Sequence, residues 1–288
     1  MIASANHHFI AQAILRNFCF NGNQLFFFSK NSQRQEIETR NIQRVFKKRH
    51  LNSYPRLDGS KDDSLEKFFA KNFDEHINEV VKIADASVLG NKKFQLNEEV
   101  FAFFVQFLYN HIKRSPDFHD PVVAEASRDE FFDDALSDFQ EKYGSVPHQE
   151  LKDLYSPEVR KRIVERSRVV NLSTQSTEIL EILAEMTAVI ATPEHSKAQF
   201  IIGSNPVARL SNSGKTHLQK DNVELWTTLK PNLAIGLVKV PRPIKAIRIS
   251  NMKVQRLNRQ LFRQSSSVAS SSKELLQNLT RTYVGILK

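Results

Sequence analysis

The sequence is poor in the residues that build several common kinds of site. Its 288 residues include one cysteine, Cys19, and only 8 glycines. A single cysteine excludes an internal disulfide and is typical of a reducing cytoplasm. No CxxC or HExxH pattern occurs, so a structural zinc or a zincin site has no support. The absence of GxxxxGK(S/T) and GxGxxG patterns excludes the glycine-rich phosphate loops.

Long apolar runs are also missing. The longest, such as residues 100–108, are too short and too closely flanked by polar residues to span a bilayer. The first five residues lack the basic-then-apolar pattern of a signal peptide. An apolar content of 40% and a charged content of 25% are typical of a soluble globular protein. We therefore expect a cytoplasmic protein with no membrane partner.

Positive charge is what the sequence has in excess, with a formal net charge of +9 at pH 7. A basic surface steers polyanions and binds them through counterion release. The basic residues form three clusters: Arg44, Lys47, Lys48, Arg49 and His50; Arg160, Lys161, Arg162, Arg166 and Arg168; and Arg242, Lys245, Arg248, Lys253, Arg256, Arg259 and Arg263. Solvated helix faces also produce such clusters. We expect a nucleic-acid partner, and a protein partner or a homo-oligomer stays an open alternative.

Residues 6–18 combine polar functional groups with apolar spacing more densely than any other stretch. A helix here would gather Phe9, Ile10, Ala13, Ile14 and Phe18 into one apolar stripe. His8, Gln12 and Arg16 follow at i, i+4 spacing and would share a ridge beside that stripe. Such a ridge is either the wall of a site or the solvated face of an ordinary first helix.

This stretch resembles the opening signature of the bacterial family known as domain of unknown function 4238, His-His-aromatic-aliphatic-Pro-Gln-x-x-Leu-Arg-x-Phe. The matching positions are His7, His8, Phe9, Ile10, Gln12, Leu15, Arg16 and Phe18. Weaker matches follow in order along nearly the whole chain: Lys30 and Asn31, Asn41, Glu66, Arg114-Ser115-Pro116, the turn from Ser204 to Val207, and Leu229-Lys230-Pro231. No settled activity comes with this family.

The pattern of the whole chain predicts an α+β fold, predominantly helical, with a small, mostly antiparallel sheet. That sheet would join an N-terminal hairpin at residues 18–28, turning at Asn21-Gly22, to late C-terminal strands. Helices are expected at residues 64–85, 97–114, 157–168, 174–191, 252–263 and 273–283, and a strand with a helical turn at 36–46. Late strands are expected at 199–203, 223–226, 233–240 and 246–249. The serine run 265–272 reads as a flexible loop, and residues 1–288 as one domain with a possible subdomain boundary near 145–157.

The enzyme hypothesis brings the residues that match the family signature into one pocket. His7, His8, Gln12, Glu66 and Arg114 are its candidate catalytic residues. A histidine titrates near cytosolic pH, Glu66 would orient it or act as a base, and Arg114 would stabilise developing negative charge. The candidate substrate-binding residues are Lys30, Arg16, Ser204, Asn205, Arg256 and Arg259. No metal ligands are assigned; if a divalent cation is the cofactor, His and Glu would be its ligands.

Two positions depart from the family signature. Ala11 replaces Pro, which relaxes the start of the first helix. Ser204 stands where the family usually has Asp, and a hydroxyl supplies neither that charge nor a comparable ligand for a hard metal. Either this chain is catalytically altered or the Asp is only a turn former, a role that Ser also fills.

The resemblance and the charge together favour a nucleic-acid-directed hydrolase. A nuclease or toxin-like effector, with a role in phage defence, is what the setting of such families implies. The alternative from a different class is a non-catalytic basic protein that binds nucleic acid or a partner through the segment from Arg242 to Arg263. A third possibility is a regulatory subunit whose Phe-rich helices expose a patch to a partner.

Overall fold

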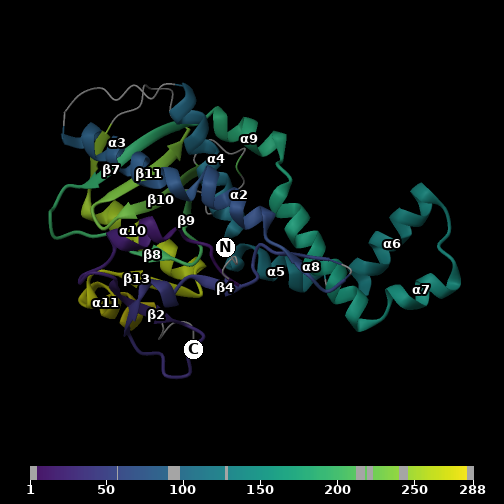
Figure 1. The fold of residues 1–288 in the computed structure, drawn as a ribbon. Helices are drawn as coiled ribbons and strands as arrows, with labels where there is room; N and C mark the ends of the chain where they lie inside the picture. The colour runs from purple at the N-terminus through teal and green to yellow at the C-terminus, as the bar shows by residue number, and fades with distance from the viewer. Residues whose placement is uncertain are drawn as a thin grey trace.

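The protein has an α+β fold, with a body built on two sheets and a helical arm that projects from it (Figure 1). The computed structural model describes residues 5–56, 58–89, 98–126, 129–211, 218, 223–239 and 246–283. Arg242 and Lys245 of the third basic cluster lie outside these ranges. Within the described residues, no helix combines the length and apolarity that crossing a bilayer requires.

The larger sheet has five strands in the order β12 (Ala246–Ile249), β7 (Thr187–Pro193), β11 (Leu233–Val238), β10 (Val223–Lys230) and β9 (Val207–Ser211). β12 runs parallel to β7, and the other neighbours are antiparallel. Alternate side chains enter two separate cores, as strand geometry requires. One core packs against α3 (Ile77–Leu89), α4 (Glu98–Arg114) and α9 (Thr177–Ala184), and the other against α10 (Asn251–Gln264).

The smaller sheet joins the two ends of the chain. Its order is β3 (Glu38–Asn41), β2 (Gln24–Ser29), β13 (Ser267–Ser270) and β8 (Ile202–Gly203). Phe28 pairs with Val268, and α11 (Lys273–Tyr283) contacts both β2 and β13. An N-terminal strand therefore does join late strands, as predicted, although the chain builds two main sheets instead of one. The expectation of a flexible serine run at 265–272 is wrong, because β13 is a central strand whose Val268, Ala269 and Ser270 are buried.

Three other expected elements differ in the structure. The hairpin at residues 18–28 does not form; Asn21 and Gln24 share a single bridge, and β2 pairs with β3 and β13 instead. The helix expected at 174–191 ends at Ala184, because the β-branched residues that follow pair in β7, with Ile190 opposite Ile235. The long helix at 64–85 is split at Phe73 into α2 (Ser64–Asn72), a 3-10 turn (Asp74–His76) and α3.

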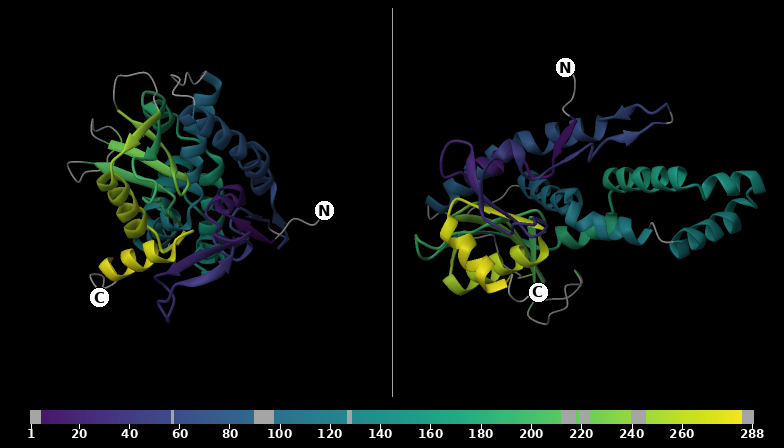
Figure 2. Two further views of the ribbon diagram at one scale, coloured as in Figure 1. Left: turned by 90° about the vertical axis from the view of Figure 1, so that its left-hand side faces the viewer. Right: turned by 90° about the horizontal axis from the view of Figure 1, so that it is seen from below.

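The arm consists of α5 (Pro116–Ala126), α6 (Asp129–Tyr143), α7 (His148–Leu154) and α8 (Pro157–Ser173). Figures 1 and 2 show α6, α7 and the start of α8 extending away from the two sheets. Tyr155, at the end of α7, donates a hydrogen bond to Asp133 of α6, and the guanidinium of Arg160 on α8 lies 4.8 Å from the ring centre of Phe132 on α6. These contacts link α6 to α7 and α8. The segment 147–157, expected as a connector, contains the helix α7.

Candidate active site

The opening stretch begins as a strand. His7 and His8 lie on β1 (Asn6–His8), which pairs antiparallel with β4 (Lys47–Arg49), and α1 runs only over Gln12–Asn17. Neighbouring side chains of a strand point to opposite sides, so His7 is fully buried and His8 is half-buried. The prediction that His8, Gln12 and Arg16 share a helix ridge is wrong, because His8 precedes the helix. Gln12 is half-buried at the start of α1, and Arg16 is exposed.

His7 lies between two carboxylates. Its Nδ1 accepts a hydrogen bond from the backbone N–H of Asn52 at 3.0 Å, so the neutral ring carries its proton on Nε2. Nε2 lies 3.7 Å from Oδ1 of Asp63, and Nδ1 lies 3.8 Å from Oε2 of Glu66. The Asn52 amide donates to the same Glu66 oxygen at 2.6 Å. The structure thus brings His7 and Glu66 together, as the sequence predicted, and adds Asn52 and Asp63 to them.

A second histidine stands at the end of β4, next to this group. His50 adopts a left-handed backbone conformation with φ +53°, which is uncommon for a residue other than glycine. Its Nδ1 lies 3.3 Å from Oγ of Ser53, and that hydroxyl donates to Oδ1 of Asp63 at 2.5 Å. Because the Ser53 proton points to Asp63, its oxygen accepts from Nδ1–H of His50. Nε2 of His50 is then the ring atom that keeps a lone pair. We call His50, Ser53 and Asp63 the His50 relay.

Positive charge surrounds the His50 relay. The pKa of His50 is lowered by burial first and then by the charges of Lys61 and Arg49, and Asp63 only partly opposes them. A lowered pKa keeps the ring neutral at pH 7, so its lone pair is available to a proton. Lys48 and Arg49 are exposed on β4, and Lys61 is exposed on β6 (Lys61–Asp62). This corner of the molecule therefore combines a neutral base with cations that attract an anionic substrate.

The second basic cluster fixes the same corner. Arg168 of α8 donates to the carbonyl of Leu51, and Arg166 donates to the carbonyl of Pro55 at 3.0 Å. Both carbonyls flank the segment that carries Asn52 and Ser53. Two arginines expected on a solvated or nucleic-acid-binding face instead hold the His50 relay against the base of the arm.

Arg114 and His8 have structural contacts. The Arg114 guanidinium is 4% exposed, donates to both oxygens of Asp74 at 2.7 and 3.2 Å, and donates to the His8 carbonyl at 2.8 Å. The His8 ring lies 3.3 Å from the carbonyl of Ile42, and burial lowers its pKa. Arg114 therefore ties α4 both to β1 and to the 3-10 turn Asp74–His76, and the His8 ring contacts the chain at Ile42. These contacts hold the strand that carries His7.

The remaining predicted residues form a separate cluster at the α4–α5 junction. Ser115 donates to the carbonyl of Ser204 at 2.8 Å, and the Ser204 hydroxyl donates to Asp117. The Asn205 backbone N–H donates to Oγ of Ser265 at 3.1 Å. Lys30 donates to the carbonyls of Phe262 and Arg263 at 2.5 and 3.1 Å, which caps the end of α10. The expected single pocket is therefore two clusters joined through the consecutive residues Arg114 and Ser115.

The model of the family described as protein of unknown function (DUF4238) matches residues 6–274. The chain belongs to this family. The match includes β1 with His7 and His8, the His50 relay, and the hydrogen-bonded group around Ser204. Neither the curated proteins nor the solved structures contain a match to the chain.

The part of the third basic cluster from Lys253 to Arg263 lies on α10, which packs on the face of the larger sheet away from α4. Arg256 donates to the carbonyl of Ser211 at 2.8 Å, and Arg259 is exposed. Arg256 thus spends part of its hydrogen-bonding capacity within the fold. Arg259 is the predicted α10 residue that is open to a ligand.

Sequence reasoning missed Asn52, Ser53 and Asp63 as site residues and counted His50 only as a member of a basic cluster. The available signal was position: His50, Asn52 and Ser53 directly follow a short strand, where loop residues carry function on a rigid element. For a divalent cation the described residues offer no group of three or more His, Cys, Asp or Glu side chains that could hold one.

Proposed function

We propose that the protein is a nucleic-acid-directed hydrolase that cleaves RNA, with His50 as its general base. The observation that supports this is the His50 relay at the end of a basic strand. Asp63 and Ser53 fix the ring so that Nε2 keeps its lone pair, and Arg49 and Lys61 hold positive charge beside it. Metal-independent RNA cleavage needs a neutral base and a nearby cation, and no protein nucleophile.

The ribose 2′-hydroxyl serves as the nucleophile. Its proton passes to Nε2 of His50, the 2′ oxygen bonds to phosphorus, and the bond from phosphorus to the 5′ oxygen breaks. The leaving 5′ oxygen takes a proton from water, which yields a 2′,3′-cyclic phosphate and a 5′-hydroxyl. Water then opens the cyclic phosphate. Arg49 and Lys61 stabilise the charge that grows on the phosphate oxygens.

The test is incubation of the purified protein with labelled single-stranded RNA, tRNA and DNA, in EDTA and with added Mg²⁺ or Mn²⁺. We expect cleavage of RNA in EDTA, cyclic-phosphate ends, and intact DNA. His50→Ala should lower the rate by about 10²- to 10⁴-fold, the usual contribution of a general base. His148→Ala, a change at an exposed histidine of the arm, is the matched control and should cleave like wild type.

Two results would count against this mechanism. Cleavage by His50→Ala at the wild-type rate would show that His50 is not the general base. Cleavage that requires an added metal would show that the reaction is metal-dependent. Asp63→Asn refines the test, because it keeps the shape of the side chain but weakens the orientation of the ring. It should lower kcat more than it raises KM.

The alternative function is non-catalytic binding of nucleic acid, and the exposed Arg259 on α10 favours it. In that case Arg259→Glu abolishes salt-sensitive binding, no RNA is cleaved and His50→Ala has no effect. Under the hydrolase proposal Arg259→Glu weakens RNA binding at most modestly, and cleavage persists.

The same chemistry in a cell would make the protein a toxin-like effector, which suits a role in phage defence. We expect induced expression of the wild-type chain in a bacterial host to slow growth and to fragment RNA. Expression of His50→Ala at the same level should do neither. Equal toxicity of the two chains would separate growth inhibition from the proposed site.

A further inference from the structure

A cavity of about 240 Å³ lies between the larger sheet and the helices α4, α5, α8 and α9. Its apolar wall includes Ile179 and Leu183 of α9 and Leu225 of β10. Polar groups enter it from three elements, namely Lys113 of α4, His119 of α5 and Arg209 of β9. None of these residues belongs to the His50 relay. An apolar chamber with a few converging polar groups is the usual form of a small-molecule site.

Arg209 brings into this cavity a positive charge that has no counterion among the described residues. It lies opposite Leu225 in the β9–β10 pair, on the sheet face that packs against α4 and α9. Burial lowers its pKa, and no acid opposes that effect. Among the described residues, none forms a hydrogen bond or ion pair with its side chain. A half-buried charge that the fold leaves uncompensated costs stability, so an anion that enters the cavity would relieve that cost.

His119 supplies a second unmet group, which is a hydrogen-bond acceptor. Its side chain is 3% exposed, and the ring is hydrogen-bonded to the backbone of Lys113. The other ring nitrogen, Nε2, is buried and has no partner among the described residues. Burial and the charges of Arg168 and Lys113 lower its pKa to about 4, so the ring is neutral at pH 7. Nε2 therefore accepts a hydrogen bond and adds no charge.

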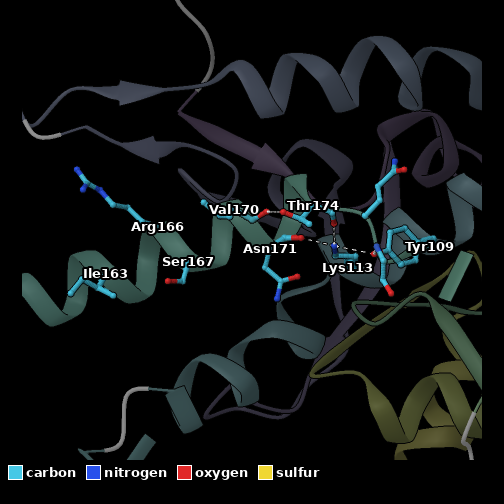
Figure 3. Close-up of a pocket in the computed structure, with 10 residues that line it drawn as sticks. Tyr109, Lys113, Ile163, Arg166, Ser167, Val170, Asn171 and Thr174 are labelled. Carbon is cyan, nitrogen blue, oxygen red and sulfur yellow. Dashed lines mark hydrogen bonds between the residues drawn. The ribbon is translucent and has the colours of Figure 1, made fainter. Parts of the chain in front are cut away.

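Lys113 is fully engaged by the protein. Its ammonium donates to the carbonyls of Asn171 and Thr174 at 2.5 and 2.6 Å and to the Tyr109 hydroxyl at 3.3 Å (Figure 3). An ammonium has three donors, and all three are used. Tyr109, Lys113, Asn171 and Ser176 also line an open cavity of about 570 Å³, so the inner chamber adjoins a wide surface hollow. In the described part of the chain, the cation of the chamber that keeps its hydrogen-bond donors free is therefore Arg209.

We propose that this chamber binds a small monocarboxylate with an apolar body and a hydroxyl group. The carboxylate pairs with the Arg209 fork, the body packs on Ile179, Leu183 and Leu225, and the hydroxyl donates to Nε2 of His119. Arg209 is the chamber cation whose donors have no partner among the described residues, and its planar fork matches the two oxygens of a carboxylate. The site is separate from the RNA chemistry proposed above and can fail or succeed independently of it.

Binding is measured by titration calorimetry on the full chain with four probes: 4-hydroxyphenylacetate, phenylacetate, the neutral 4-hydroxyphenylacetamide, and inorganic phosphate. We expect 4-hydroxyphenylacetate to bind, phenylacetate to bind several-fold more weakly, and the amide and phosphate to bind at least about tenfold more weakly. The same order is expected for 10-hydroxydecanoate over decanoate if the body is aliphatic. Equal binding of the amide and the acid would overturn the role of Arg209, and binding of none of the organic acids would overturn the proposal.

Variants separate the site from the fold. Arg209→Gln should lose carboxylate binding at least tenfold, and Arg209→Lys should retain part of it. Arg248→Gln, a change at an exposed arginine of β12 at the opposite edge of the same sheet, is the matched control and should bind normally. Ile179→Trp fills the apolar end and should block binding with Arg209 intact. Unchanged affinity in both Arg209→Gln and Ile179→Trp would overturn the proposal.

Discussion

Two arginines of this protein enter the interior, and their surroundings are opposite. Arg114 meets both oxygens of Asp74, the carbonyl of His8 and the ring of Phe69, whose centre lies 4.7 Å from the guanidinium carbon. Arg209 meets no acid among the described residues, and its pKa is lowered by burial alone. A buried cation that is paired with an acid is part of the framework, whereas one without a counterion is available to a ligand. The family resemblance made Arg114 a candidate catalytic residue, yet Arg209 has the features of a binding residue.

The largest effect on stability should come from replacing Arg114, the arginine that is paired with an acid. Arg114→Leu leaves the Asp74 carboxylate and the His8 carbonyl without their donor, and it should lower the free energy of unfolding by about 3–5 kcal/mol. Urea denaturation measures this loss. Arg16→Leu, at an exposed arginine of α1, is the control and should stay within about 0.5 kcal/mol of wild type. A loss below about 1 kcal/mol for Arg114→Leu would contradict the framework role.

The second-largest effect should be a loss of folding stability at low pH through His111, which lies close to Arg114. Burial, and then the charge of Arg114, lower the pKa of His111 from 6.5 to about 3 in the folded protein. The unfolded chain therefore takes up this proton first, so stability is complete above pH 6.5 and falls as the pH drops toward 3. The slope should be about 1.4 kcal/mol per pH unit from His111. Urea denaturation of His111→Leu between pH 7 and pH 4 should show a shallower slope by that amount, and an unchanged slope would exclude His111 as its source.

A smaller change in stability, of opposite sign, is expected from replacing Arg209. Arg209→Leu removes a charge that the fold leaves uncompensated, so the free energy of unfolding should rise by about 1 kcal/mol in ligand-free protein. For a chain of this size that is a rise in Tm of roughly 2–4 °C. Thermal unfolding checks it, with Arg248→Leu as the exposed control. A fall in Tm would mean that Arg209 supports the fold, and the contrast with Arg114 would disappear.

The smallest change in stability should come from an exposed pair. Lys48 of β4 lies 3.1 Å from both oxygens of Asp120, and such surface pairs contribute about 0–1 kcal/mol. Lys48→Gln should leave stability nearly unchanged but should weaken RNA binding across sequences and reduce its salt slope by about 1. Binding titrations over a series of salt concentrations measure both effects. An unchanged slope would remove Lys48 from the RNA-binding surface.

Local patterns predicted the elements whose stabilising contacts are themselves local. The apolar spacing of residues 97–114, 252–263 and 273–283 identified α4, α10 and α11, because a helix is built from near neighbours. The prediction of a flexible loop at residues 265–272 was wrong for the opposite reason. Its four-residue strand β13 is held by β2 and β8, which come from distant parts of the chain, and no local pattern reports such pairing.

The candidate site shows the same limit. The family signature led to His7, Glu66 and Arg114, and the structure does gather them near one strand pair. It could not reveal that Asp74 neutralises Arg114, that Lys30 caps a helix, or that Ser53 connects His50 to Asp63. Each of these facts depends on a partner chosen by the fold. The sequence shows which chemistry a side chain can perform, but only the fold shows whether that side chain already has a partner.

The position of β13 has a consequence for how the protein is made. Residue 28 pairs with residue 268, so about 240 residues must be synthesised between the two partners. At roughly 5–20 residues per second, β2 waits on the order of ten to fifty seconds for its central neighbour. During that time an apolar strand with the sequence Phe26-Phe27-Phe28 has an open edge on the nascent chain. The smaller sheet therefore closes only after β13 has been synthesised, and until then one edge of β2 stays open to pairing with other chains.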